Sequence, residues 1–438
     1  MLILELTQKC NLSCKYCCYS TNYPRFRSHG QSSLSLEIAE LAVARHLDAP
    51  CSNRVISFYG GEPLLEFEIL KKIVSFAENH CIKNSKSPPS FSLTTNGTLL
   101  TDDVLHFLVE HQFCILISID GDKQSHDQNR IFRETGAGSF DVIEQNINRF
   151  IELYPKYDKR GIITTLTADN DFYSSNVFMR RYKQYFPVLI VNYVSDDVEI
   201  DAKSKQYCSN TFSCAASYCD NQKIIPFVNW TIERQDFYDK CFNMFYSQLT
   251  HSVENAKNDW PIFWELFIGN YRQIHQRTLK NKIQYTVACS CIPGAVRLYC
   301  NTEGNYYPCE KVETSDALCI GNVWSGIDSK KVQGLIEYLG EHADCNNCKG
   351  KFLCGICPTS ITEGKKNETD TVLIRKTCEE TLARLPQYLQ KYTDIMEMMP
   401  SLLDDIYANV SHGNDWLEDV LFLVSTNQNC HKAHTYEK

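Results

Sequence analysis

Short apolar runs alternate with stretches of helical periodicity through the first half of the chain. Six of these runs have the length of a buried strand, at residues 2–6, 55–59, 91–95, 114–119, 162–166 and 188–194. The intervening stretches carry apolar residues at helical spacing, as at 35–47 and 66–79, and Ser35, Thr101 and Ser139 are placed to cap helices. Strands alternating with helices predict βαβ units, a parallel sheet and right-handed crossovers.

Six such units fit an α/β fold, a partial (β/α)6 barrel of the TIM type. In parallel sheets the ligand-binding residues lie at the carboxyl ends of the strands. A cysteine loop follows the first strand, the segment 60–63 (Gly-Gly-Glu-Pro) the second, Asn96 the third and Asp120 the fourth. Paired glycines at such a point let a ligand approach the backbone closely. The sequence therefore predicts a binding site along this edge of the sheet.

Three cysteines follow the first strand: Cys10, Cys14 and Cys17, separated by three and then two residues. Thiolates this close in sequence can share one metal centre, and runs of this kind hold iron–sulfur clusters. A disulfide would leave one of the three without a partner, and three ligands would leave one iron of a four-iron cluster open. On the triplet alone, zinc or a structural site is the alternative. Cys18 is too close to Cys17 to ligate the same cluster.

The composition narrows the class of protein. At 438 residues the chain is long enough for two or three domains, and 43% hydrophobic and 22% charged residues are typical of a globular protein. Its first strand leaves no room for a signal peptide, and no apolar run reaches membrane-spanning length. Twenty-two cysteines then favour metal binding in a reducing compartment, and so a cytoplasmic location. The net charge of −9 argues against nucleic-acid binding.

With Tyr16 before its last cysteine, the triplet resembles that of the radical S-adenosylmethionine (SAM) enzymes. In those enzymes three cysteines hold a [4Fe–4S] cluster, and SAM chelates the fourth iron. The resemblance implies the same partial barrel, with SAM contacts at its strand ends. These contacts are Gly60, Gly61, Glu62 and Pro63 to the amino group, Asn96, Ser118 and Asp120 to the ribose and methionine portion, and Ser139 to the carboxylate. Turns that merely end a strand are the alternative for each.

A segment after the fourth predicted strand adds to the resemblance to radical SAM enzymes. His126, Asp127 and Arg130 resemble the His-Asp-x-x-Arg segment of radical SAM peptide maturases. A solvated loop with a local ion pair is the alternative.

A second cysteine-rich stretch resembles the SPASM domain that follows the barrel in peptide-modifying members of this group. The resemblance implies two auxiliary [4Fe–4S] clusters, the outer held by Cys345, Cys348, Cys354 and Cys378, and the inner by Cys291, Cys309 and Cys357. Cys289 is the fourth inner ligand, or else one iron stays open. Two residues separate Cys354 from Cys357 where the family usually has three, and two CxxC pairs also fit zinc.

Glu310 directly follows Cys309. In sulfatase-maturating relatives an acidic residue at this place acts as the base for the substrate, so the resemblance implies a catalytic role for Glu310. A surface glutamate in a turn is the alternative. The predicted domains are the radical SAM barrel at 1–230, a helical linker at 231–288, the SPASM domain at 289–380 and a helical tail at 381–438.

The resemblance implies an enzyme of oxidoreductase type that modifies a ribosomally synthesised peptide through a 5′-deoxyadenosyl radical. The wording of its motifs is most similar to maturases of cysteine-rich peptides, which implies a thioether between a Cys sulfur and a carbon. A carbon–carbon crosslink, epimerisation and formylglycine generation in a sulfatase are the alternatives among enzymes. A zinc-stabilised binding protein without catalysis is the alternative outside them.

The implied partners are the precursor peptide and an electron donor such as flavodoxin or ferredoxin, with no nucleic acid and no membrane. Many peptide maturases carry a leader-binding domain before the triplet, and nine residues cannot contain one. Leader recognition is therefore expected from a separate protein or from the tail, or does not occur, unless the sequence is a piece of a longer chain.

Overall fold

The structure is a computed structural model of the whole chain. It describes residues 1–17, 19, 29–49, 54–166, 172–195, 199–200, 204–205, 208–211, 243–265, 268, 293–295, 297–312, 314–342, 345, 347–350 and 371–402.

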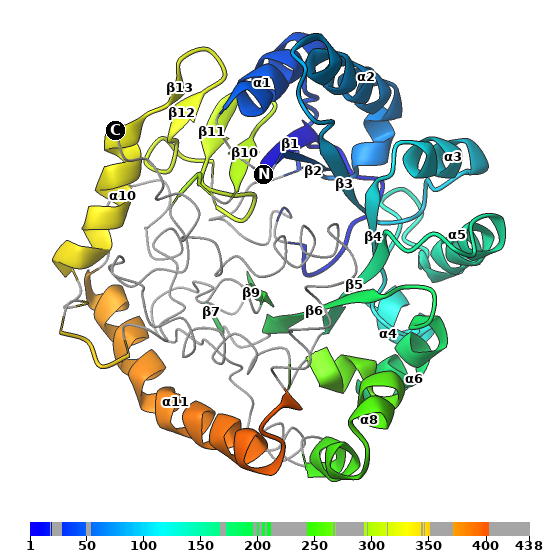
Figure 1. Cartoon of the computed structure of the whole chain (residues 1–438), viewed down its shortest axis with the longest axis vertical. Helices are drawn as coiled ribbons and strands as arrows, with labels where there is room; N and C mark the ends of the chain where they lie inside the picture. Colours follow the sequence, from blue (N-terminus) through cyan, green and yellow to red (C-terminus); the bar gives the residue numbers. More distant parts are fainter. Residues whose placement is uncertain are drawn as a thin grey trace.

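Six parallel strands form the wall of a partial barrel, as the periodicity predicts. They are β1 (Leu2–Thr7), β2 (Val55–Gly60), β3 (Ser90–Thr95), β4 (Cys114–Ser118), β5 (Arg160–Leu166) and β6 (Val188–Ser195). Each pairs in parallel with the next in chain order. In Figure 1 the strands follow an arc from the top of the molecule down its right side.

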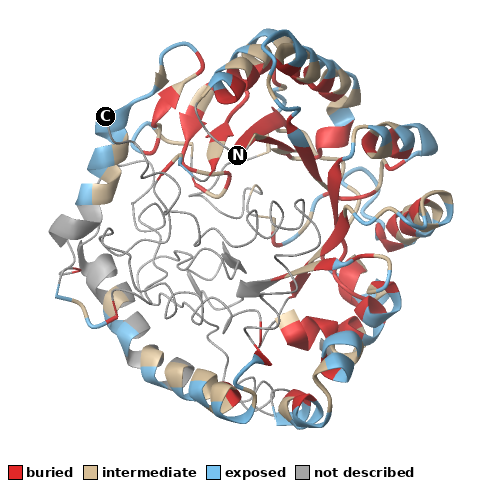
Figure 2. Ribbon diagram, viewed as in Figure 1, coloured by how far each residue is buried: buried red, intermediate tan, exposed pale blue. Residues whose placement is uncertain are grey.

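Helices cover the outer side of this arc (Figure 1). They are α1 (Leu36–Asp48), α2 (Phe67–Lys83) after the short η1 (Pro63–Glu66), α3 (Asp102–Glu110), α4 (Lys123–Asp127), α5 (Phe140–Leu153), α6 (Phe172–Tyr182) and α8 (Val253–Asp259). Their buried faces point toward the sheet in Figure 2, because apolar residues at helical spacing lie on one side. No described helix is long and apolar enough to cross a bilayer.

Two of the three predicted N-caps are confirmed, and the third works differently. The side chains of Ser35 and Thr101 accept hydrogen bonds from backbone N–H groups in the first turns of α1 and α3. Ser139 holds the N-cap position of α5, but its side chain makes no capping bond. Instead, an Asp127 carboxylate oxygen accepts the N–H of Phe140 at 2.9 Å. The Ser139 hydroxyl is therefore available for other contacts.

β1 separates two hydrophobic clusters, because alternate side chains of a strand point to opposite faces. Leu2, Leu4 and Leu6 join the large core between the sheet and its helices. Met1 and Ile3 belong to a smaller cluster, together with Tyr299, Tyr307, Val312 and Leu318. The first strand thus packs against chain that lies almost 300 residues later.

The region beyond residue 297 extends the same sheet. The strands β10 (Leu298–Cys300), β11 (Asn305–Tyr307), β12 (Gly321–Asn322) and β13 (Gly326–Ile327) pair antiparallel with one another in chain order, as short β-hairpins of the kind that the resemblance to a SPASM domain implies. β10 pairs in parallel with β1, a connection that the sequence does not predict. The cysteine-rich domain as a unit stays a prediction.

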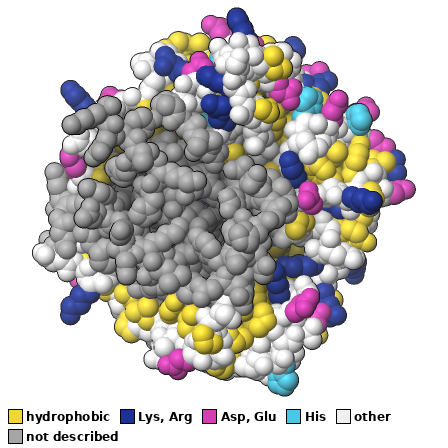
Figure 3. All heavy atoms as spheres, viewed as in Figure 1, with side chains coloured by type: hydrophobic (Ala, Val, Ile, Leu, Met, Phe, Trp, Pro, Cys, Tyr) yellow, Lys and Arg dark blue, Asp and Glu magenta, His cyan; other side chains and the backbone are white. Residues whose placement is uncertain are grey.

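The remaining elements lie at the two ends of the arc. β9 (Cys208–Thr211) pairs with β6, and β7 (Glu199–Ile200) pairs with β8 (Ser204–Lys205). On the left of Figure 1 lie α10 (Ser329–His342) and α11 (Thr371–Met398). The helix predicted from about residue 381 is part of α11, so the predicted boundary at 380/381 falls inside one helix. On the face in Figure 3, acidic and basic side chains are interspersed around the described rim.

Candidate functional site

The cysteine loop after β1 is fastened to the segment after α4. Ser13 N–H donates to the Ile131 carbonyl at 2.8 Å, and Lys15 N–H donates to the Asn129 carbonyl at 3.0 Å. An isolated antiparallel bridge between Leu12 and Phe132 adds to this pairing. Residues 129–133 therefore act as a short strand that fixes the backbone between the first two cysteines.

Three N–H groups point at the sulfurs of this loop. Leu12 N–H donates to Cys10 Sγ at 3.4 Å, and the Asn96 amide donates to the same sulfur at 3.9 Å. Arg130 Nη1 donates to Cys14 Sγ at 3.9 Å. Hydrogen bonds of this kind stabilise thiolates and tune the clusters that thiolates hold.

The third cysteine has a histidine neighbour. Cys17 Sγ lies 3.6 Å from His29 Nε2, while His29 Nδ1 lies 3.1 Å from the Gln8 carbonyl. Because the carbonyl can only accept, Nδ1 carries the proton and Nε2 is the acceptor from the thiol. His29 therefore holds Cys17 in a defined orientation at the end of the loop.

Burial acts on the thiols of this loop. It raises the pKa of Cys10 to about 12, with the nearby Glu62 carboxylate as the next cause, and it raises the pKa of the Cys14 thiol. Such thiols become thiolates only when a cation binds them. Within the residues described, no three His, Cys, Asp or Glu side chains converge on a point that could hold a single metal ion. Ligands of a four-iron cluster bind separate irons, so a cluster does not require three side chains to converge on one point.

The two glycines after β2 let another part of the chain approach closely. Gly61 N–H donates to the Thr7 carbonyl at 2.8 Å, and Glu62 N–H donates to the Lys9 carbonyl at 2.9 Å. Gly60 has φ +137°, and a Cβ there would lie 2.3 Å from the Thr7 oxygen. A Cβ on Gly61 would lie 2.1 Å from the Lys9 oxygen. The close neighbours are thus the end of β1 and the cysteine loop that follows it, and the contacts of these glycines to SAM stay a prediction.

Glu62 is fully buried beneath this loop. Its carboxylate accepts from Asn96 N–H at 2.7 Å, the Thr95 hydroxyl at 2.8 Å and Leu64 N–H at 3.1 Å. Burial raises the pKa of Glu62 to about 7, although these three donors oppose the rise. The carboxylate therefore ties the ends of β2 and β3 together, with Pro63 opening η1 beside it.

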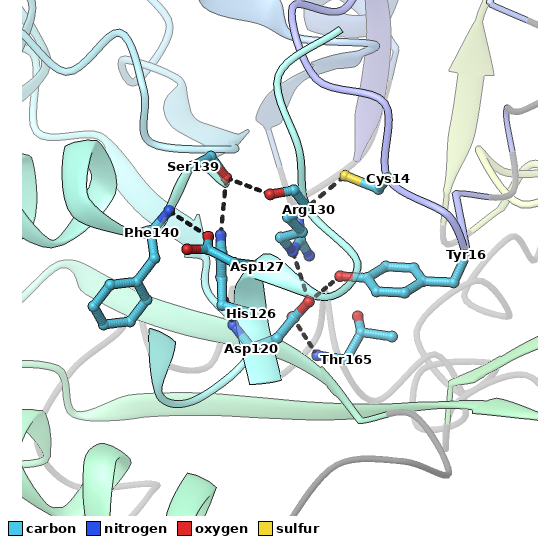
Figure 4. Close-up of polar contacts among 9 residues, drawn as sticks. All are labelled: Cys14, Tyr16, Asp120, His126, Asp127, Arg130, Ser139, Phe140 and Thr165. Carbon is cyan, nitrogen blue, oxygen red and sulfur yellow. Dashed lines mark hydrogen bonds and ion pairs between the residues drawn. The ribbon is translucent and has the colours of Figure 1, made fainter. Parts of the chain in front are cut away.

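Asp120 is the centre of a buried network at the ends of β4 and β5 (Figure 4). One of its carboxylate oxygens accepts from the Tyr16 hydroxyl and from Arg130 Nε, the latter at 2.8 Å. The other accepts Thr165 N–H at 2.8 Å. The Arg130 guanidinium also lies 5.4 Å from the centre of the Tyr16 ring. The solvated ion pair that was the alternative reading of this segment is therefore wrong.

His126 supports this network from the other side (Figure 4). Asp120 N–H donates to His126 Nδ1 at 3.2 Å, and Nε2 lies 2.9 Å from the Ser139 hydroxyl. Burial lowers the pKa of His126 to about 4, so the neutral ring carries its proton on Nε2. Ser139 in turn donates to the Arg130 carbonyl at 3.0 Å. The hydrogen bonds from Asp120 through His126 and Ser139 to Arg130 therefore form a closed ring, because Arg130 Nε also donates to Asp120.

A cysteine triplet held against polar groups at the strand ends is the arrangement described so far, and the comparisons with known proteins point to the same class of domain. Residues 4–171 match the model of the Radical SAM superfamily. This stretch is a radical SAM domain. The predicted enzyme class and its two cofactors, a [4Fe–4S] cluster and SAM, are confirmed at the level of the superfamily. The thiols of Cys10, Cys14 and Cys17 and the N–H donors around them fit such a cluster.

Similarity extends beyond the radical SAM domain in fold more than in sequence. The structure described as native anSMEcpe with bound AdoMet gives a TM-score of 0.59 at 20% identity, covering 90% of this chain and 99% of that one, which shows a shared fold. The cysteine-type anaerobic sulfatase-maturating enzyme of Clostridium novyi (strain NT) is 29% identical over 213 residues, 48% of this chain and 55% of that enzyme.

A relative with another activity is the radical SAM cyclopropyl synthase TigE of Paramaledivibacter caminithermalis. It is 24% identical over 183 residues, 40% of this chain and 36% of the synthase. The chain thus spans about half, or less, of the length of these curated relatives.

Outside the radical SAM domain, Glu310 is buried and not at the surface. Its carboxylate forms an ion pair with Arg297, which is buried as well. The Glu310 carbonyl accepts the Tyr19 hydroxyl at 3.0 Å, and Tyr19 lies two residues after Cys17. The surface alternative for Glu310 is wrong, and its role as a base stays a prediction. Arg297 and Tyr19 are not identified from the sequence, because no motif near either residue indicates that it contacts Glu310.

The remaining predicted residues fall into two groups. Ser118 is buried at the end of β4, and four predicted auxiliary ligands are described: Cys309, Cys345, Cys348 and Cys378. The other four, Cys289, Cys291, Cys354 and Cys357, lie outside the described residues, as does Cys18. The auxiliary cluster assignments therefore stay predictions.

Proposed function

We propose that this chain is a radical SAM enzyme that forms a thioether between a Cys sulfur and a carbon of a ribosomally synthesised peptide. Cys10, Cys14 and Cys17 would hold the [4Fe–4S] cluster, and residues at the carboxyl edge of β2 to β4 would contact SAM. When bound, these cofactors supply a 5′-deoxyadenosyl radical that removes a hydrogen atom from the substrate carbon. The observation that carries the proposal is the fastening of the cysteine loop to three strand ends by polar contacts: Gly61 and Glu62 after β2, Asn96 after β3 and Asp120 after β4.

In this proposal the chain orients its cofactors and excludes water from them. The backbone contacts of Gly61 and Ser13 fix the loop, and Asn96 directs an amide proton at Cys10. Asn96, Ser118 and Asp120 lie where SAM would contact the strand ends. A contact between Ser139 and the SAM carboxylate requires its hydroxyl to leave His126 and the Arg130 carbonyl.

The first experiment tests the cluster and the splitting of SAM. Anaerobically reconstituted protein, reduced with dithionite in the presence of SAM, is expected to release 5′-deoxyadenosine. Cys14→Ala should abolish this release and lower the iron content by about four per chain, since it removes one of three ligands. Cys81→Ala is the matched control, because Cys81 is a buried thiol of α2 that packs in the core. Wild-type protein that binds zinc and no iron would refute the proposal.

The second experiment identifies the bond. Thioether formation removes two hydrogens from the peptide: one would leave with 5′-deoxyadenosine and the other as a proton from the thiol, and the predicted auxiliary clusters would supply the acceptor for the one surplus electron. We expect a mass loss of two hydrogens together with a thiol that no longer reacts with alkylating reagents. The same mass loss with reactive thiols would indicate a carbon–carbon crosslink. Deuterium uptake without loss of hydrogen would indicate epimerisation.

Formylglycine generation in a sulfatase is the second candidate. The similarity to the Clostridium novyi sulfatase-maturating enzyme favours it. A peptide carrying the sulfatase cysteine, incubated under the same conditions, would then be converted to an aldehyde that reacts with hydrazides. Aldehyde formation with that peptide, and no change in a cysteine-rich precursor peptide, would replace the thioether assignment.

The auxiliary clusters and partners belong to the same proposal. Two further [4Fe–4S] clusters would bring the iron content to about twelve per chain. The electron donor is a small redox protein such as flavodoxin or ferredoxin. If Glu310 acts as a base, Glu310→Gln should block product formation while 5′-deoxyadenosine release continues. Equal loss of both would assign Glu310 to structure through its pair with Arg297.

A further inference from the structure

Arg130 is held in one orientation by contacts on three sides. Its side chain is 9% exposed, and its Nε donates to Asp120 at 2.8 Å. The guanidinium lies against the Tyr16 ring, and Nη1 faces Cys14 Sγ at 3.9 Å. Arginine presents its donors in a rigid plane, so one anchored edge determines where the other edge points. The anchor at Asp120 thus directs a positive group at the sulfur.

We propose that Arg130 is a positioning residue for the electron-transfer step: clamped by Asp120, its guanidinium stabilises the reduced form of the cluster bound through Cys14. This rests on the cluster site of the proposed function. Reduction adds one electron, taken from dithionite or the donor protein, and no proton. The added negative charge is shared by the cluster and its sulfur ligands. A fixed cation beside one ligand therefore favours the reduced state more than the oxidised state.

Burial makes this effect larger than that of other arginines near the loop. Arg133 donates to the Cys10 carbonyl at 3.0 Å and to the Leu12 carbonyl at 3.3 Å, and it is an exposed residue. Water and salt screen its charge, whereas Arg130 acts through a region of low polarisability. Arg133 is therefore a matched comparison, because it is an arginine on the same loop whose hydrogen bonds described above go to backbone carbonyls.

The test is a redox titration of the cluster. It is monitored through the electron paramagnetic resonance signal of the reduced cluster, which is identified as the one that changes when SAM is added. Arg130→Gln is expected to lower the midpoint potential, reducing the fraction of reduced cluster at a fixed potential about tenfold, or ~59 mV for one electron. Arg130→Lys keeps a charge near Asp120 and should shift less. Arg133→Gln should shift least of the three.

A double variant guards against loss of folding. Asp120→Asn with Arg130→Gln leaves no unpaired buried charge, and it should still lower the potential because the oriented positive group is gone. If both Arg130→Gln and the double variant bind iron normally and keep the wild-type potential, the Arg130 proposal is overturned while the proposed function stands. Wild-type protein without any SAM-sensitive signal would overturn both.

Discussion

Two buried arginines lie at opposite ends of the barrel wall, and they have different partners. Arg130, beyond the carboxyl end of β4, meets the Asp120 carboxylate and the Cys14 sulfur. Arg160, the first residue of β5, donates to three backbone carbonyls, those of Tyr185 at 2.5 Å and of Tyr154 and Pro155 at 3.2 Å. Its guanidinium also lies about 5 Å from the rings of Phe150 and Phe186.

The different partners distinguish Arg130, a residue of the candidate site, from Arg160, a residue that stabilises the fold. Carbonyls and aromatic rings around Arg160 are fixed partners, so its guanidinium closes the amino-terminal end of the sheet. The partners of Arg130 are a carboxylate and a thiol, and the thiol is a group that can bind a metal centre. In barrels of this kind the carboxyl edge carries the chemistry and the amino-terminal edge carries stability. Substitutions at the two edges should therefore be measured by different readouts.

The largest effect is expected at the carboxyl edge from Gly61→Ala. The new Cβ would lie 2.1 Å from the Lys9 carbonyl oxygen, so the cysteine loop must move away from β2. We expect at least about a 100-fold loss of 5′-deoxyadenosine release, because displacements near 1 Å cost that much. Iron content should fall while the far-ultraviolet circular dichroism spectrum stays unchanged.

Gly334→Ala is the control for this substitution. Gly334 lies in α10 with nothing within 4 Å of an added Cβ, so the helix should be unchanged or gain about 0.5–1 kcal/mol. Wild-type iron content in Gly61→Ala would show that the loop does not depend on this close approach.

A smaller effect, on stability alone, is expected at the amino-terminal edge from Arg160→Leu. Three partly buried hydrogen bonds to backbone carbonyls would be lost, which should lower the free energy of unfolding by about 3 kcal/mol. The protein that remains folded should keep its iron and its redox potential. Thermal unfolding midpoints provide the measurement, with the exposed Arg149→Leu as a control expected to change little. An unchanged unfolding midpoint for Arg160→Leu would contradict the claim that the amino-terminal edge contributes stability through Arg160.

The smallest effect concerns pH at the amino-terminal edge. Burial lowers the pKa of His46 to about 3, while the unfolded chain titrates near 6.5, so the folded state resists protonation. Stability from this residue is therefore present above pH 6.5 and is lost as the pH falls. Between pH 7 and 5.5 the loss should be about 1 kcal/mol.

His46→Gln should remove this share of the pH dependence, as seen in unfolding midpoints at the two pH values. His106→Gln, at an exposed position of α3, should leave it in place. Identical pH dependence in wild type and His46→Gln would contradict the assignment.

Local patterns were enough to predict the barrel. Six strands and the caps at Ser35 and Thr101 follow from apolar spacing and from single side chains near each helix start. The sequence also placed the cysteine triplet, Glu62, Asn96 and Asp120 at one edge, because parallel strands end together. These statements need only residues that are close in sequence.

What the sequence could not predict depends on distant partners. Asp120 meets Tyr16 from 104 residues away and Thr165 from 45 residues away, and no local signal announces either contact. The pairing of β10 with β1 and the ion pair of Glu310 with Arg297 are of the same kind. The close approach of Gly61 to the Lys9 carbonyl is a further example, since spacing indicates a tight contact without saying which group comes near.

β1 has a neighbour on each side, β2 and β10, and the two are synthesised at very different times. β2 emerges soon after β1, whereas Leu298 follows on the order of ten seconds or more later at usual rates of translation. During this interval the growing polypeptide lacks the β10 partner of one edge of β1, and an unpaired strand edge is the kind that invites aggregation. Completion of the sheet, and with it protection of the nascent chain, must therefore wait for the ribosome to pass residue 300.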